Sequence, residues 1–261
     1  GQGDAGTVTI NARDRVSLDG IGSNGIPSAA GSRVELSGVG EGGSINITTG
    51  SLSLTNGAVL GASTLGKGNG GRVTIFARDS VSLDGVDSNG LASAVGGTVE
   101  STAVGNGGSV NITTGTLSIN NLAQLTVNSK GNGAAGNIAI IADNLRLNNQ
   151  GNLTAQSVTG TGGNIQLQTR NILLRNESTM SAVSAPGSAE GNIDINTETL
   201  ILLKGSQIRT DALAPQGGSN IRITPVNSLG LAVFQSQNSV ISASGNTTVT
   251  GSIQPQSSQT M

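Results

Sequence analysis

The stretch that decides the fold is residues 43–50, Gly-Ser-Ile-Asn-Ile-Thr-Thr-Gly, which returns as residues 108–115, Gly-Ser-Val-Asn-Ile-Thr-Thr-Gly. A second pair, residues 6–14 and 71–79, has the same separation of 65 positions (108 minus 43, and 71 minus 6). Looser copies of the opening follow, so that repeats start near residues 6, 43, 71, 108, 136, 163, 191 and 218. The unit is therefore 27 or 28 residues long, and the first and third units each carry about nine more.

Within each repeat, apolar residues alternate with polar residues, which is the pattern of a strand and not of a helix. Residues 45–47 show it in the first strand, where two isoleucines flank an asparagine that we expect to point outward. A second apolar pair follows at 52–54, and a third, weaker pair at 60–62. Turns rich in Gly, Asn and Ser separate the pairs, so each repeat predicts three short strands.

This repetition predicts an all-β fold, a parallel β-helix (solenoid) of about eight coils of 27–28 residues with two expanded coils. In a solenoid each strand pairs with the equivalent strand one repeat later, so like side chains stack on like. Glycine at each coil start would supply a sharp corner and leave room where coils stack. We expect one repeat domain over residues 1–253 and a flexible C-terminal tail over 254–261. The opening residues 1–4 resemble the middle of a repeat, which indicates a fragment of a longer protein.

The composition excludes several functional classes. Of 261 residues, 41 are Gly, two are Phe, and Trp, Tyr, Cys and His are absent. The absence of Cys removes disulfides, thiol catalysis and thiolate metal sites. The net charge is −2 and the basic residues are scattered, so we expect no nucleic-acid partner. No run is long enough for a transmembrane helix, so we also expect no membrane insertion.

The two expanded coils, residues 20–42 and 85–107, are the candidate binding surface. Each begins with a Ser-Asn-Gly turn, at 23–25 and 88–90, and each continues into an extra strand-like stretch, at 33–36 and 98–100. We expect both to project from the same side of the rod, two coils apart. Insertions of this kind often form the binding face of a solenoid. The alternative is a duplicated decoration that has no ligand.

The last repeat is richer in bulky residues than the others, over 228–234. Because a solenoid needs a terminal unit that closes its open core, we expect Phe234 to plug that end.

A catalytic site would have to use carboxylates. Acidic positions recur at Asp14 with Asp79 and at Asp19 with Asp84, and stacking two coils apart would separate each pair by roughly 10 Å. That separation is within the range of inverting glycoside hydrolysis. Each Asp also flanks a corner, where Asp commonly caps a turn, and we favour this interpretation.

No other catalytic or cofactor motif stands out, so we predict no catalytic, cofactor-binding or metal site, no cofactor, and no enzyme activity. The three lysines, which a Ser or Thr nucleophile would need as base, lie outside any recognisable motif: Lys67, Lys130 and Lys204. The Gly-rich segments 68–71 and 105–108 lack the following helix and Lys-Ser/Thr of a phosphate loop, so their interpretation is structural. Five Asn-X-Ser/Thr sequons are unremarkable in this composition, at Asn46, Asn111, Asn152, Asn176 and Asn246.

Residues 42–58, GGSINITTGSLSLTNGA, and 71–85, GRVTIFARDSVSLDG, resemble the repeat region of filamentous-haemagglutinin-type exoproteins, especially the large cyanobacterial ones. The resemblance covers nearly the whole chain, from Gly6 to about Ile253. It implies a right-handed parallel β-helix exported through an outer-membrane two-partner-secretion pore of a Gram-negative cell. The family's N-terminal secretion domain is not in this chain, and no catalytic residues carry over.

The resemblance implies a structural or adhesive stalk at the cell surface, acting in adhesion, aggregation or biofilm formation and contacting a surface glycan or protein receptor. The alternative is a carbohydrate-binding or carbohydrate-active β-helix, a polysaccharide lyase or hydrolase, that uses the face around the four aspartates.

Overall fold

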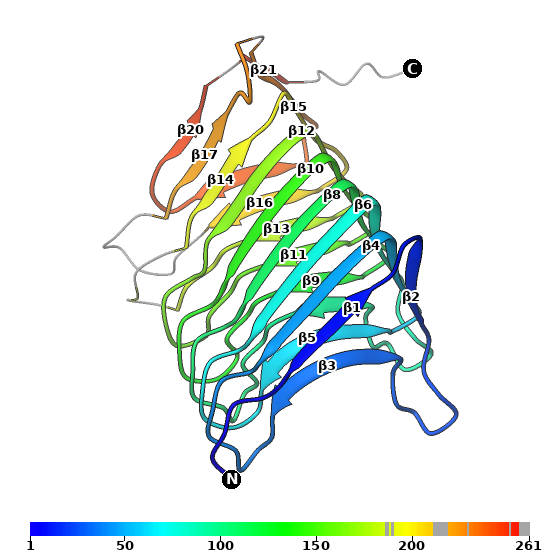
Figure 1. The fold of residues 1–261 in the computed structure, drawn as a ribbon. Coiled ribbons are helices and arrows are strands. Elements are labelled where there is room, and N and C mark those ends of the chain that lie inside the picture. The colour runs from blue at the N-terminus through cyan, green and yellow to red at the C-terminus, as the bar shows by residue number, and fades with distance from the viewer. Residues whose placement is uncertain (186–187, 189–190, 211–218, 229, 251, 256–261) are drawn as a thin grey trace.

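The computed structural model describes residues 1–185, 188, 191–210, 219–228, 230–250 and 252–255. Within these ranges every regular element is a β-strand, and the strands form two sheets with parallel pairing (Figure 1). The fold is therefore all-β, as predicted, and its arrangement is consistent with a β-helix-like solenoid.

The larger sheet takes the first and second strands of each repeat, which run together into one long strand in repeats two to six. Its strands are β1 (Thr7–Asn11), β2 (Arg15–Asp19), β4 (Ser44–Thr55), β6 (Arg72–Asp84), β8 (Ser109–Asn120), β10 (Asn137–Asn148), β12 (Ile165–Arg175), β14 (Ile193–Asn196), β15 (Thr199–Leu202), β17 (Ile221–Thr224), β18 (Ala232–Gln235), β20 (Thr247–Val249) and β21 (Ser252–Pro255).

The smaller sheet takes the third strand of each repeat. Its strands are β3 (Ala29–Val34), β5 (Val59–Thr64), β7 (Ala94–Gly96), β9 (Gln124–Thr126), β11 (Asn152–Thr154), β13 (Thr179–Ser181), β16 (Gln207–Thr210) and β19 (Val240–Ala243).

The register follows the sequence repeat. β4 pairs with β6 from Ser44 and Arg72, 28 positions apart, and β6 pairs with β8 from Arg72 and Ser109, 37 positions apart. Each inner strand lies between its equivalents in the preceding and the following repeat. The predicted repeat starts therefore match the pairing, except that the start at 218 lies outside the described residues.

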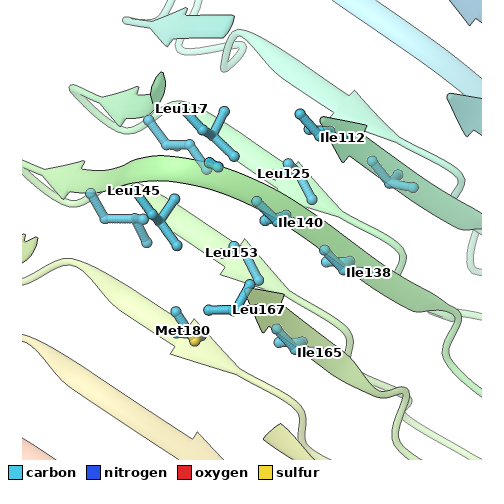
Figure 2. Close-up of a cluster of buried hydrophobic side chains, with 14 of the residues drawn as sticks. Ile112, Leu117, Leu125, Ile138, Ile140, Leu145, Leu153, Ile165, Leu167 and Met180 are labelled. Atoms are coloured by element: carbon cyan, nitrogen blue, oxygen red, sulfur yellow. The ribbon is translucent and has the colours of Figure 1, made fainter. Parts of the chain in front are cut away.

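The core lies between the two sheets, and the predicted alternation is confirmed. In β4 the inward residues Ile45, Ile47, Leu52 and Leu54 are buried, and so are their equivalents in later repeats. Side chains from both sheets belong to one hydrophobic cluster. Figure 2 shows equivalent residues of successive repeats in rows, such as Leu125, Leu153 and Met180. Aliphatic residues in register thus form a continuous interior.

Glycine at the repeat starts is required by close approach of the backbones. A Cβ added to Gly71 would overlap the carbonyl oxygen of Gly43, one repeat earlier. The same collision links later repeats in one stack: Gly108 on Gly71, Gly136 on Gly108, Gly163 on Gly136, and Gly191 on Gly163. The prediction that these glycines leave room where repeats stack is confirmed, and this stack is called the glycine ladder.

An asparagine ladder runs beside the glycine ladder in the later repeats. The side-chain oxygen of Asn137 accepts hydrogen bonds from the backbone N–H of Asn164 at 3.0 Å and from its side-chain amide at 3.1 Å. The backbone N–H contact recurs in each following repeat, from Asn192 to Asn164, from Asn220 to Asn192, and from Asn246 to Asn220. Each rung satisfies a backbone donor at the edge of the sheet.

A tight turn joins the second strand to the third in most repeats. In the second repeat Asn56 and Gly57 both have positive φ, and the N–H of Ala58 donates to the carbonyl of Thr55 at 3.1 Å. Two consecutive residues of positive φ are the signature of a type I′ turn. Equivalent pairs with positive φ occupy 121–122, 149–150, 176–177 and 204–205.

The C-terminal end differs from the prediction. Phe234 is 42 % exposed, so it does not plug the core. It follows Val233, which is buried, and the alternation of β18 therefore turns the ring outward, beside Ile201 of β15. Beyond the eighth repeat, β20 and β21 add a further layer on β17 and β18. β21 reaches Pro255, and the rest of the predicted tail, 256–261, lies outside the described residues.

Candidate binding surface

The expansion of repeats one and three is concentrated in two hairpin loops, residues 20–28 and 85–93, which replace the tight turn. The first closes with an antiparallel bridge between Ile21 and Pro27, and the second with one between Val86 and Ala92. Their internal backbone bonds match: Gly22 N–H to Ile26 carbonyl at 2.8 Å, and Asp87 N–H to Leu91 carbonyl at 2.9 Å. The two hairpin loops are therefore one structure repeated 65 residues apart.

Register shows where the added residues lie. Arg15 pairs with Ser51, 36 positions on, whereas Ala29 pairs with Val59, 30 positions on. Six of the nine added residues therefore fall between β2 and β3. The predicted extra strand at 33–36 is wrong, because Arg33 and Val34 belong to β3, the regular third strand. Likewise Val99 bridges to Thr64 and Ser129 in the neighbouring repeats, so 98–100 follows the regular path.

Both hairpin loops carry an exposed apolar residue at the same position. Ile26 is 62 % exposed and Leu91 is 43 % exposed. The turns that present them are held by side chains: Asn24 accepts the N–H of Ile26 at 3.1 Å, and Asp87 accepts those of Asn89 and Leu91, both at 2.8 Å. Side-chain bonds of this kind stabilise the turn locally. Each loop thus presents an ordered Ser-Asn-Gly tip and one aliphatic side chain to solvent.

Two of the four aspartates, Asp19 and Asp84, hold corners. Asp19 and Asp84 share one column of the sheet, with Thr55 between them. The Asp19 carboxylate accepts hydrogen bonds from the Thr55 hydroxyl and, at 2.9 Å, from the Asn56 amide. These bonds, the Thr55 bond first, hold the pKa of Asp19 below its ordinary value. The Asp84 carboxylate accepts a hydrogen bond from the Asn121 amide at 2.8 Å. These contacts agree with the turn-capping interpretation.

The other two aspartates each lie beside an arginine. Asp14 is 3.9 Å from Arg13, and both side chains are almost fully exposed. Asp79 is 3.0 Å from Arg78, and its hydrogen bonds raise the pKa of that guanidinium. In both pairs the carboxylate is exposed to solvent.

The remaining sequence candidates have structural surroundings. Lys130 is paired with Glu100 at 3.2 Å, and Lys204 occupies a tight turn with φ of 52°. The glycine-rich segments 68–71 and 105–108 contribute Gly71 and Gly108 to the glycine ladder, in agreement with their structural interpretation. In the part of the chain that the structure describes, no three His, Cys, Asp or Glu side chains gather where a metal could sit. None of the described residues forms a helix that could span a membrane.

A groove that was not foreseen lies where the first strand meets the second. It has a volume of about 400 Å³ and is lined by Phe76, Ile141 and Val226 together with Arg78, Asp143 and Arg170. Arg170 and Asp143 form an ion pair at 3.2 Å. The signal was present in the sequence, because Val73 and Ile75 point inward and the alternation therefore turns Phe76 outward.

Comparison of the chain with protein-family models, with curated proteins and with solved structures finds no match.

Proposed function

We propose that the chain is a structural and adhesive stalk segment of a secreted or cell-surface exoprotein, acting in adhesion, aggregation or biofilm formation and not in catalysis. The observation that carries the proposal is the repetition of one ordered hairpin loop, at 20–28 and 85–93, on an otherwise regular stack of strands. Two copies of an exposed aliphatic residue on a rigid scaffold suit multivalent contact, in which weak sites add through effective concentration.

The architecture that we propose is a closed, right-handed parallel β-helix of about eight coils. The parallel pairing at intervals of 27, 28 and 37 residues supports it, and so does the single core between the two sheets. Parallel strands joined within one sheet by a crossover are right-handed in nearly all proteins.

The likeness of residues 42–58 and 71–85 to filamentous-haemagglutinin-type exoproteins supports a location and an export route. We propose that a Gram-negative cell exports the chain through an outer-membrane two-partner-secretion pore. The chain would then contact a surface glycan or a protein receptor outside the cell.

Replacing the hairpin loops tests the adhesive role. Residues 20–28 and 85–93 are each exchanged for Asn-Gly-Ala, which is the turn that repeat two uses at 56–58. Because β2 and β6 would then join β3 and β7 as β4 joins β5, the variant should stay folded. Polystyrene beads coated with it should attach to Gram-negative cells on the order of tenfold less than beads coated with the native chain, since two contacts are lost together.

The matched control is Leu122→Gly, which gives repeat four the same Asn-Gly-Ala turn at a position without a hairpin loop. It should attach like the native chain. Equal attachment by the native chain and the double replacement, or no attachment by either, would count against the proposal. A glycan array combined with an activity screen tests catalysis: cleavage that disappears in Asp14→Ala and Asp79→Ala would show an enzyme instead.

A further inference from the structure

Both aromatic residues of the chain lie on its surface. Phe76 and Phe234 are the only Phe, Tyr or Trp among 261 residues, and Phe76 is 51 % exposed. Aromatic rings normally contribute to cores because each buries so much apolar area. Here the core is aliphatic, and a ring is instead left open to solvent on the wall of a groove.

The groove arises from a change of residue size at one position of the repeat. Its floor is a row of small, buried residues in register, Ala77, Thr114, Ala142 and Thr169. One wall is the adjacent outward row, which contains Phe76 and then Thr113, Ile141 and Gln168 in successive repeats. Three strand spacings of about 4.8 Å give this wall a length of roughly 14 Å. The groove therefore runs across the strands, along the direction in which the repeats stack.

Each of the two arginines that line the groove is paired with a carboxylate. Arg78 is held by Asp79 through two hydrogen bonds, of 3.2 and 3.0 Å, and Arg170 is held by Asp143. Each guanidinium has five N–H donors, more than these bonds use. The opposite wall therefore offers guanidinium donors and the Asp143 carboxylate, and Asp79, outside the lining, pairs with Arg78. Because both guanidinium groups are already paired, this wall suits a neutral ligand better than an anionic one.

We propose that this groove binds a linear, neutral polysaccharide, with the Phe76 ring packed against the apolar face of one pyranose and the wall of Arg78, Asp143 and Arg170 bonding hydroxyl groups. Its elongated form fits a polymer, and the spacing of the repeats is close to the length of one sugar unit. The inference rests on the proposed adhesive function, to which it adds a ligand class. The binding site is separate from the hairpin loops.

Affinity electrophoresis of the full chain tests the proposal. The gels contain hydroxyethylcellulose, xyloglucan or galactomannan as neutral polymers, and polygalacturonate as the acidic one. At least one neutral gel should retard the native chain. Phe76→Ala should weaken binding on the order of tenfold, a change of 1.4 kcal/mol, and Phe76→Tyr should keep it, because tyrosine retains the ring. Phe234→Ala, the other exposed ring, is the matched control and should change binding less than twofold.

The proposal is overturned if no neutral gel retards the chain, if only polygalacturonate does, or if both alanine variants lose binding equally. Sedimentation of Phe76→Ala and of the native chain tests whether a second copy of the chain occupies the groove. A difference in oligomeric state between the two would show that it does. Because the ring is exposed, the thermal midpoint of Phe76→Ala should match that of the native chain. If coated beads attach to cells but no neutral gel retards the chain, the polysaccharide proposal is wrong and the adhesive proposal is retained.

Discussion

The first four repeats and the later ones have the same interior and different surfaces. Inward residues are aliphatic and buried in both regions, as in β4 and β12. Outside, repeats one and three carry the hairpin loops, whereas from the fifth repeat onward the asparagine ladder follows each repeat start. The outward row of the second strand changes too, from Ser17, Ser53, Ser82 and Ser118 to Arg146, Leu173, Ile201 and Phe234.

The stacked strands and the surface features that they carry are therefore independent of each other. A hairpin loop of nine residues replaces a turn of three without disturbing the pairing of β3 with β5 or of β7 with β9. The glycine ladder also continues through both regions. Surface residues can therefore vary between repeats as long as the inward rows and the glycines are kept.

The largest effect is expected where the two regions are alike. Gly71→Ala in the first region and Gly163→Ala in the second each push a Cβ into a carbonyl oxygen of the preceding repeat. Backbone atoms cannot yield as a flexible side chain can, so each variant should lose more than about 4 kcal/mol of stability or fail to fold.

Urea unfolding measures this, with Gly6→Ala as the control, because nothing lies within 4 Å of the Cβ that it would add. A ladder variant as stable as Gly6→Ala would show that the stack is looser than described. A large loss in one region only would show that the two interiors differ.

A loss of stability of intermediate size is expected in the later repeats and not in the first four. Asn164→Ala removes a rung that bonds Asn137 on one side and Asn192 on the other. The loss should be about 1 kcal/mol, the usual net value of a hydrogen bond. Ser44→Ala, at the same position of repeat two, should cost less than about 0.5 kcal/mol. The urea midpoints of the two variants make the comparison, and equal losses would remove the asparagine ladder as a difference between the regions.

The smallest effect is expected on stability at acidic pH, through a residue of the first region alone. Because hydrogen bonds lower the pKa of Asp19 in the folded chain, its contribution to stability is present above the carboxyl pKa of the unfolded chain, about 3.9. It is lost as the pH falls through the folded value. The thermal midpoint of the native chain should therefore fall slightly more between pH 5 and pH 3 than that of Asp19→Asn. The effect is small because solvent screens an exposed group.

Asp14→Asn is the matched change, at a side chain that is 85 % exposed. Identical acid responses of the native chain and Asp19→Asn would mean that the corner bonds to Thr55 and Asn56 do not distinguish the charged carboxylate.

Most of the fold could be predicted from the sequence, because register and repeat spacing are the same quantity in a parallel stack. The inward rows, such as residues 45–47 and 52–54, and the glycines at the repeat starts follow directly from periodicity. The expansions were placed less well: an apolar alternation at 33–36 predicts a strand but does not say whether that strand is additional. Only pairing with β5 shows that Arg33 and Val34 belong to the regular third strand.

The surface was harder to predict because it depends on which side of the alternation a residue occupies. For Phe234, size suggested a plug, although its position next to Val233 already indicated the outward side. The asparagine ladder has a visible signal, Asn directly after Gly at 137, 164 and 192, but its meaning depends on backbone donors that the sequence does not display. The groove can be recognised only in the three-dimensional structure, since its floor and wall come from four repeats.

The pairing pattern has a consequence for how the chain acquires its structure. The partner of each strand lies between 20 and 37 positions away in the sequence, from Ala232 and Ser252 at the shortest to Thr7 and Ser44 at the longest. Contacts that join distant parts of a chain slow folding, and none of these strand pairs needs one. Each repeat can therefore pair with the repeat that folded just before it. Folding of this kind can advance from one end, with a growing edge that exposes only a single layer at a time.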